Sequence, residues 1–174
     1  MTDNLLQNVE GVLERIRQKD IELFSWGNDA DIYEVGDSAL IKIFNDTDSR
    51  GLSKRTSKDA AIFEYKIGTF LYRNSLHVPE FYDLVTIDEE RYGIVMEKVN
   101  GKKYLDVFCN HREEMVKQFY QEIKLAYNLG IIPQDKNYHD NALFNSENMQ
   151  IYLIDFARWR VANKSKYINP FPEL

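Results

Sequence analysis

The chain has 174 residues, of which 44% are hydrophobic, and it carries a formal net charge of −6 at pH 7. This length is enough for one domain with a real core or for two small lobes, but not for two full domains. The acidic balance disfavours a nucleic-acid or anionic-membrane partner, because such surfaces need clustered lysine and arginine side chains.

A single cysteine, Cys109, excludes an internal disulfide framework and a cysteine-rich zinc site. The first eleven residues carry charges where a signal peptide needs an apolar core, and no apolar run approaches the roughly 20 residues of a membrane span. These features predict a cytoplasmic location, with a translocated effector as the alternative.

In the first half, residues 2–20 place apolar side chains at helical spacing behind a cap at Thr2 or Asp3, which predicts an amphipathic helix. Residues 21–44 instead alternate with a period of two, which predicts consecutive antiparallel strands. A second helix is predicted over residues 60–74. Two further strands around an acidic turn then follow before Gly101.

The second half begins with a predicted helix over residues 112–130 that stops at Gly130, a residue suited to the left-handed end of a helix. Strands followed by helices favour an α+β protein with two lobes. We expect one bilobal domain, with a five-stranded antiparallel sheet and one inserted helix over about residues 1–99. A reduced, mainly helical lobe is expected over about residues 100–174.

The segment NALFNSENMQIYLIDFA, which begins at Asn141, predicts a β-hairpin. Ala142–Phe144 and Ile151–Ile154 can pair through a turn at Ser146–Asn148, and that pairing brings Asn141 and Asp155 to the same end. An amide oxygen beside a carboxylate is the half-shell that Mg²⁺ takes when phosphate and water supply the other ligands. The alternative is a simple hydrogen bond at the hairpin end.

Three earlier features can be interpreted in two ways each. Gly27, between two predicted strands in GNDADIY, either serves only a turn or lets backbone amides approach a phosphate. Lys42, inside the apolar strand ALIKIF, either points outward or points into a cleft that holds an anion. Glu64, midway along the second predicted helix, either faces water or holds the ammonium group of Lys42.

In this order, the glycine turn, the strand lysine, the helix glutamate and an Asp…Asn…Asp-Phe array resemble the protein-kinase-like superfamily over about residues 26–158. GNDADIY resembles the nucleotide loop Gly-x-x-Ala-x-x-Tyr of RIO and small atypical kinases, which assigns Gly27 and Ala30 to nucleotide binding. IVMEKVNGK is similar to the strand and hinge that contact adenine, with Met96 as gatekeeper and Glu97 to Val99 as hinge.

The resemblance implies ATP and Mg²⁺ as cofactors. Lys42 would contact the α- and β-phosphates, and Glu64 would pair with Lys42. Asp155 would bind the Mg²⁺ that bridges the phosphates, and Asn141 would hold the second metal site. These roles are chemically reasonable because phosphoryl transfer needs positioning and charge neutralisation more than covalent help.

The catalytic aspartate has two candidate positions, because the family spacing of five residues before Asn141 falls on Lys136. In one register Asp135 is catalytic, the loop has one extra residue, GII forms the end of the long helix and NALF forms the next strand. In the other register Asp140 is catalytic and Asn145 is the metal ligand, which uses up residues of that strand. We favour Asp135 with Asn141, because a missing strand costs more than a one-residue bulge.

The sequence departs from the family in its single loop glycine, in DFA for DFG, and in the short tail without Ala-Pro-Glu after Ala157. It therefore resembles minimal bacterial kinases, including short effector kinases and the compact kinase of the KEOPS complex. A substrate could dock on basic residues that otherwise form a solvated surface: Arg50, Lys54, Arg55 and Lys58. The histidines show no metal-ligand spacing, and Trp26 and Trp159 are expected to pack in the core.

We expect a minimal serine/threonine protein kinase that transfers the γ-phosphate of ATP to a hydroxyl of a protein substrate. One alternative is a small-molecule kinase of the aminoglycoside or choline type. The other is a nucleotide-binding pseudokinase that acts by binding a partner protein.

Overall fold

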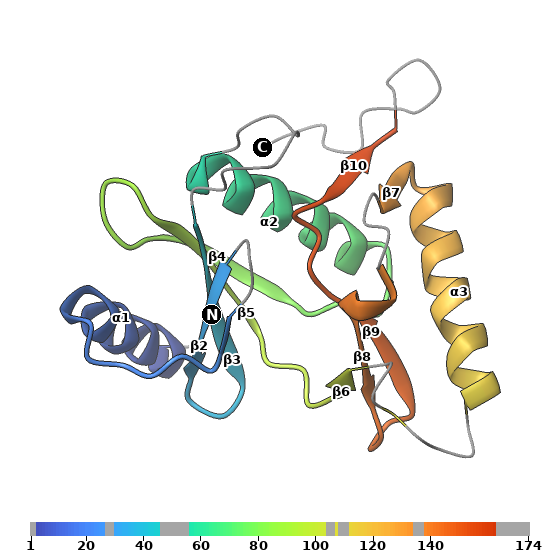
Figure 1. Ribbon diagram of the computed structural model, residues 1–174, viewed down its shortest axis with the longest axis horizontal. Coiled ribbons are helices and arrows are strands. Elements are labelled where there is room, and N and C mark those ends of the chain that lie inside the picture. The colour runs from blue at the N-terminus through green and yellow to red at the C-terminus, as the bar shows by residue number, and fades with distance from the viewer. Residues whose placement is uncertain are drawn as a thin grey trace. The chain divides into compact units, whose positions relative to one another are not determined.

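The computed structural model describes residues 3–26, 30–45, 56–103, 107, 112–133 and 138–162. The chain is an α+β protein that divides into two compact units (Figure 1). The first unit comprises Met1–Tyr65 and Glu80–Lys98, and the second comprises Lys66–Pro79 and Val99–Leu174. The division falls within the helix Ser57–Arg73. Residues 66–79 therefore belong to the second unit, although they precede the last two strands of the first unit in the sequence.

Each predicted helix is present: α1 (Asp3–Gln18), α2 (Ser57–Arg73) and α3 (Arg112–Asn128). Helix α2 begins three residues before its predicted start because Thr56 caps it. The Asp59 amide donates to Thr56 Oγ1 over 3.1 Å, and Thr56 Oγ1 donates to Asp59 Oδ2 over 2.9 Å. Gly130, at φ 78°, follows α3 in the left-handed conformation that its sequence position predicts.

The first unit contains a five-stranded sheet in the order β1-β2-β3-β5-β4, with every neighbouring pair antiparallel. Its strands are β1 (Ser25–Trp26), β2 (Ala30–Val35), β3 (Ala39–Phe44), β4 (Phe81–Thr86) and β5 (Tyr92–Glu97). The central strand β3 places Lys42 between Ile32 of β2 and Ile94 of β5. Gly93 allows this close pairing, because a Cβ atom there would lie 2.9 Å from the Lys42 carbonyl oxygen.

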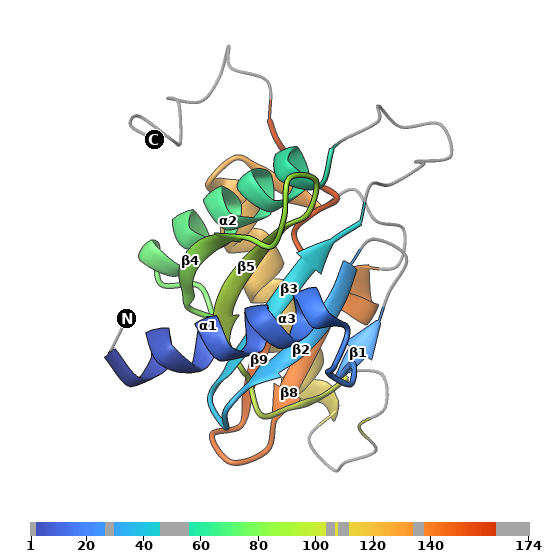
Figure 2. The ribbon, with the colours of Figure 1, turned by 90° about the vertical axis from the view of Figure 1, so that its left-hand side faces the viewer.

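Helix α1 covers one face of this sheet, lying across β2 and β3 in Figure 2. Its buried side chains Val9, Leu13 and Ile16 form a core with sheet residues that include Ile41 and Ile43. Burial of each such side chain contributes roughly 1.5–3 kcal/mol. Because successive residues of a strand point to opposite faces, Lys42 and Phe44, which alternate with Ile41 and Ile43, face away from α1.

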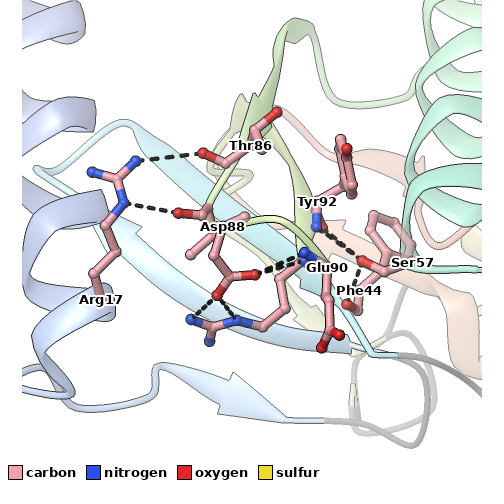
Figure 3. Close-up of polar contacts among 9 residues, drawn as sticks. Arg17, Phe44, Ser57, Thr86, Asp88, Glu90 and Tyr92 are labelled. Atoms are coloured by element: carbon pink, nitrogen blue, oxygen red, sulfur yellow. Dashed lines mark hydrogen bonds and ion pairs between the residues drawn. The ribbon is translucent and has the colours of Figure 1, made fainter.

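The turn between β4 and β5 is fixed by polar contacts that also reach α1 (Figure 3). Asp88 Oδ1 accepts the amides of Glu90 and Arg91, and its Oδ2 accepts from the Arg91 guanidinium over 2.7 Å. Arg17 of α1 donates to the carbonyl oxygens of Ile87, over 2.8 Å, and Thr86, over 3.4 Å. These contacts fix the last two strands of the sheet to the helix that covers it.

The second unit contains two small sheets beside α3. One has the order β6-β8-β9 and the other pairs β7 with β10, with bounds β6 (Lys102–Lys103), β7 (Ile131–Pro133), β8 (Ala142–Asn145), β9 (Gln150–Leu153) and β10 (Trp159–Val161). A short 3-10 helix, η2 (Tyr138–Asn141), leads into β8. Helix α3 packs against β7 and β9. It buries the apolar side chains of Met115, Phe119, Ile123 and Ala126.

Two sequence expectations for this unit need correction. We expected GII to end the long helix, but Gly130 terminates α3, and Ile131 and Ile132 lie in β7, opposite Val161 and Arg160. We also expected a mainly helical lobe, whereas five short strands accompany α3 in the described residues. Strands of two or three residues carry too little alternation to be found by their period. No helix in the described part of the chain combines the length and apolar composition of a membrane span.

Candidate functional site

The most prominent polar feature of the first unit is a buried ion pair between β3 and α2. Lys42 Nζ donates to both carboxylate oxygens of Glu64, each over 2.9 Å. The Lys42 side chain is 6% exposed and that of Glu64 is 1% exposed. The structure therefore decides both sequence alternatives: Lys42 does not point outward, and Glu64 does not face water.

The position of this pair follows from the covering of the sheet. Ile41 and Ile43 pack in the core beneath α1, so strand alternation turns Lys42 towards the opposite face. There the ammonium group also lies 5.1 Å from the centroid of the Phe44 ring. A lysine in this setting has a fixed direction, which a lysine on a solvated strand lacks.

Ser57 makes a second attachment between α2 and the sheet, and our sequence analysis missed it. Its buried hydroxyl donates to the Phe44 carbonyl over 2.7 Å and accepts the Tyr92 amide over 2.9 Å (Figure 3). Ser57 and Glu64 are seven residues apart, so they lie on the same face of α2. The cap sequence Thr-Ser-Lys-Asp was the signal that a polar helix start lies here.

The second unit contains the predicted hairpin. Ala142 pairs with Leu153 and Asn145 pairs with Gln150, which confirms the predicted partners and the position of the turn. Beyond this ladder, the Ile154 amide donates to the Asn141 carbonyl over 2.9 Å. The pairing therefore brings Asn141 to the same end of the hairpin as Asp155, the next residue after Ile154.

Asp155 has an unusual backbone conformation, with φ at 61°. The other described residues with positive φ, glycines apart, are Lys19 and Ser75, which follow the ends of helices, and Met149, which lies in the hairpin turn. Asp155 instead lies in the connection between β9 and β10. Aspartate tolerates this region better than most residues, and such conformations are concentrated at functional sites.

The donor groups at this end of the hairpin suit Mg²⁺. An amide oxygen of Asn141 and the carboxylate of Asp155 are hard oxygen ligands, and both residues are partly exposed. Among the described residues, no group of three histidine, cysteine, aspartate or glutamate side chains could hold a metal by itself. Two protein ligands are compatible with Mg²⁺ bound to phosphate, because this ion usually keeps phosphate and water ligands.

The two registers for the catalytic aspartate differ at Asn145. Its Oδ1 accepts the amides of Glu147, over 2.8 Å, and Asn148, over 3.4 Å, within the hairpin turn. Asn145 therefore lies at the opposite end of the hairpin from Asn141. Asp140 is exposed in η2, whereas Asp135 lies outside the described residues.

The proposed adenine-contacting residues lie at the end of β5. Met96 is buried, and the Glu97 amide donates to the Glu80 carbonyl over 2.8 Å. The Lys98 amide donates to the Ser38 carbonyl over 2.9 Å, so these two amides are already satisfied within the first unit. Val99 is the first residue of the next segment of the second unit.

The remaining predicted positions divide between described and undescribed parts of the chain. Ala30 is buried opposite Phe44, and Lys58 is exposed with Nζ 5.4 Å from the Tyr92 ring centroid. Trp159 is buried, as expected, and meets the Phe156 ring edge-on at 5.0 Å. Other positions of the sequence analysis fall outside the described residues: Gly27, Arg50, Lys54, Arg55, Cys109 and the side chain of Trp26.

No family model and no curated protein matches the sequence. Solved structures match the fold. The RIO2 kinase of Chaetomium thermophilum, in an ADP/Mg²⁺-phosphoaspartate complex, is 21% identical with a TM-score of 0.58 over 86% of this chain and 52% of its own. A structure of WbdD is 16% identical with a TM-score of 0.57 over 83% of this chain and 34% of its own.

A further WbdD structure, described as a bifunctional kinase-methyltransferase, is 16% identical with a TM-score of 0.57, covering 81% of this chain and 35% of its own. The chain thus spans about half of the RIO2 chain, at 52%, and about a third of WbdD, at 34%. These similarities show that the chain has a protein-kinase-like fold.

Proposed function

We propose that the chain is an ATP- and Mg²⁺-dependent phosphotransferase of the protein-kinase-like type. In this function the ammonium group of Lys42 binds the α- and β-phosphates of ATP, and Glu64 holds that group in place. The observation that carries the proposal is the buried Lys42–Glu64 pair, with both carboxylate oxygens 2.9 Å from the ammonium nitrogen.

A buried ion pair of this kind is poorly explained by stability alone. Removing two charges from water costs several kcal/mol for each ion, and replacing such pairs by apolar side chains is often neutral or stabilising. A fixed ammonium group is useful, however, where a polyphosphate must be oriented. The overall charge of −6 agrees with this interpretation, because it disfavours a broad polyanion surface and leaves recognition to a local group.

Asn141 and Asp155 supply the metal ligands in this proposal. The hydrogen bond from the Ile154 amide to the Asn141 carbonyl supports a role for the two residues at one end of the hairpin. Mg²⁺, when bound there with a nucleotide, neutralises charge on the phosphate oxygens. RIO2 kinase, a structural neighbour, was solved with ADP and Mg²⁺, which agrees with the proposed cofactors.

Asp135 is the proposed catalytic carboxylate. It orients the acceptor hydroxyl and takes its proton as the hydroxyl oxygen bonds to the γ-phosphorus and the bond from that phosphorus to the bridging oxygen of ADP breaks. The position of Asn145 in the hairpin turn supports this register, since the other register needs Asn145 as a metal ligand. Met96 and the backbone of Glu97–Val99 contact adenine in this proposal.

The acceptor we propose is a serine or threonine hydroxyl of a protein. This finer part of the proposal rests on the resemblance of the nucleotide loop GNDADIY to that of RIO kinases. A screen with sugars, amines and aminoglycosides tests the alternative acceptors, and phosphorylation of these compounds but not of protein would overturn the proposed acceptor.

The proposal is tested by incubating the protein with labelled ATP, Mg²⁺ and generic protein substrates. We expect label transfer or autophosphorylation in the wild type, and loss of both in Asp155→Asn, which removes charge but tolerates the left-handed backbone. Asp37→Asn, at an exposed turn between β2 and β3, is the matched control and should retain transfer. Asp135→Asn and Asp140→Asn then distinguish the two registers, because only the catalytic one should abolish transfer.

Two outcomes would overturn the proposal. Transfer that persists in Asp155→Asn excludes Asp155 as a required metal ligand. If nucleotide raises the melting temperature only with Mg²⁺, yet no phosphate is transferred or hydrolysed, the chain is a nucleotide-binding module and not an enzyme.

A further inference from the structure

Strand β9, which leads to Asp155, is an edge strand. In the described part of the sheet it pairs with β8 on one side only. The amides of Ile151 and Leu153, two residues apart, therefore point to the edge that β8 does not cover. Unpaired edge amides leave a strand weakly held, unless other groups accept their hydrogen bonds.

One side chain of α3 and one backbone carbonyl of a neighbouring loop accept these hydrogen bonds. The Ile151 amide donates to Gln118 Oε1 over 3.3 Å, and Gln118 Nε2 donates to the Met149 carbonyl over 3.1 Å. The Leu153 amide donates to the carbonyl of His77 over 2.9 Å. The edge of β9 is thus satisfied by α3 at its start and by the loop after α2 at its end.

Glu122 fixes the position of that loop. Its Oε2 accepts the His77 amide over 3.1 Å, and its Oε1 lies 2.7 Å from His77 Nδ1. The Glu122 side chain is only 9% exposed, so these contacts compensate for a carboxylate removed from water. Among the described residues, Lys42, Ser57, Glu64 and Glu122 are the buried polar or charged ones, and the proposed chemistry gives Glu122 no role.

Gln118 and Glu122 are four residues apart and lie on the same face of α3. We propose that they are positioning residues for Asp155: together they hold the outer edge of β9, while the Ile154 amide is held by Asn141 on the inner edge. Hydrogen bonds on both sides of the strand then fix the two residues before Asp155, whose backbone adopts the left-handed conformation. This inference rests on the proposed function, since it assumes that Asp155 binds Mg²⁺.

The test compares ADP binding with Mg²⁺ and with EDTA, using calorimetry on the full chain. Groups that orient a metal ligand typically change metal affinity by about 10–100-fold when mutated. We therefore expect Glu122→Ala to raise the Mg²⁺ concentration for half-maximal binding at least about 10-fold. ADP binding in EDTA should stay within about 2-fold of wild type. The reason is that Asp155 contributes to ADP binding only through the metal, which EDTA removes.

Matched variants separate positioning from general damage. Glu114→Ala removes an exposed carboxylate from the first turn of the same helix and should bind like wild type. Glu122→Gln retains an acceptor for the His77 amide and should recover most of the Mg²⁺ affinity. If Glu122→Ala does not fold, Gln118→Ala replaces it, with the same expected loss and a faster hydrogen exchange of the Ile151 amide.

The outcomes distinguish this inference from the function on which it rests. If the wild type shows no Mg²⁺-dependent binding of ADP, the proposed function and this inference both fail. If the wild type binds it and the tested variant, Glu122→Ala or its replacement Gln118→Ala, binds as tightly as Glu114→Ala, only the positioning role is overturned. An equal loss of ADP affinity in Mg²⁺ and in EDTA also overturns it.

Discussion

Removing either partner of the Lys42–Glu64 pair should destabilise the protein far more than removing both. In Lys42→Met the carboxylate of Glu64, 1% exposed, loses an ammonium group 2.9 Å from each oxygen. In Glu64→Leu the buried ammonium group loses its carboxylate. Each change leaves one charge buried without its partner, which costs about 3–5 kcal/mol.

The double variant Lys42→Met/Glu64→Leu has a different expected result. The attraction across 2.9 Å is about 6 kcal/mol at an effective dielectric constant of about 20, and the desolvation of two ions offsets a similar amount. Replacing both by apolar side chains of similar volume should therefore give a free energy of unfolding within about 1 kcal/mol of wild type, or above it.

Urea denaturation measures these free energies, and calorimetry gives the melting temperatures. For a chain of this size, a loss of about 3–5 kcal/mol lowers the melting temperature by roughly 6–20 °C. Glu34→Leu is the matched control for Glu64→Leu, because Glu34 pairs with Lys98 at the surface and is 44% exposed. Such a surface pair contributes about 0–1 kcal/mol.

Phosphate transfer separates the stability argument from the functional one. The double variant should be stable yet inactive, because it lacks the ammonium group that we propose binds the phosphates. Two results would refute the reasoning: single variants as stable as Glu34→Leu would contradict the burial argument, and transfer by the double variant would exclude Lys42 from the chemistry.

Three further predictions concern single residues. Ser57→Ala should lower the free energy of unfolding, measured by urea denaturation, by about 1–3 kcal/mol, because two backbone groups lose their partner. A loss no larger than that of Ser38→Ala, in an exposed turn, would contradict this. Asp155→Ala should be about 1 kcal/mol less stable than Asp155→Asn, because alanine disfavours φ near 61°; equal stability would show that the backbone is not strained. Burial raises the pKa of Asp88, but hydrogen bonds from the side chain and amide of Arg91 and from the amide of Glu90 outweigh it and lower that pKa below 3.8. The ionised Asp88 carboxylate therefore stabilises the protein above its ordinary pKa, and this contribution is lost as the pH falls through the lowered pKa. Asp88→Asn should be less stable than wild type at pH 6, and the difference should shrink at acid pH. A constant difference in urea midpoint would refute this.

The sequence by itself determined the local structure. Helices α1 and α3 follow from apolar spacing, and the end of α3 follows from Gly130, which adopts φ 78°. The hairpin of β8 and β9 was predictable with its register, because its strands are close in sequence and its ends carry polar residues. The same pairing predicted that Asn141 and Asp155, the proposed metal ligands, lie at one end of the hairpin.

The tertiary structure decided what depends on distant partners. Alternation in β3 allowed Lys42 to face either side, and the packing of α1 over Ile41 and Ile43 determined which side it faces. The pairing of β7 with β10 joins short segments more than 20 residues apart, whose strands have too few residues to show a period. The contacts of Ser57 and Glu122 are also non-local, since they join residues distant in the sequence and include backbone groups that no side-chain pattern identifies. Sequence periodicity records which face of an element is buried, but only the fold determines which atoms meet there.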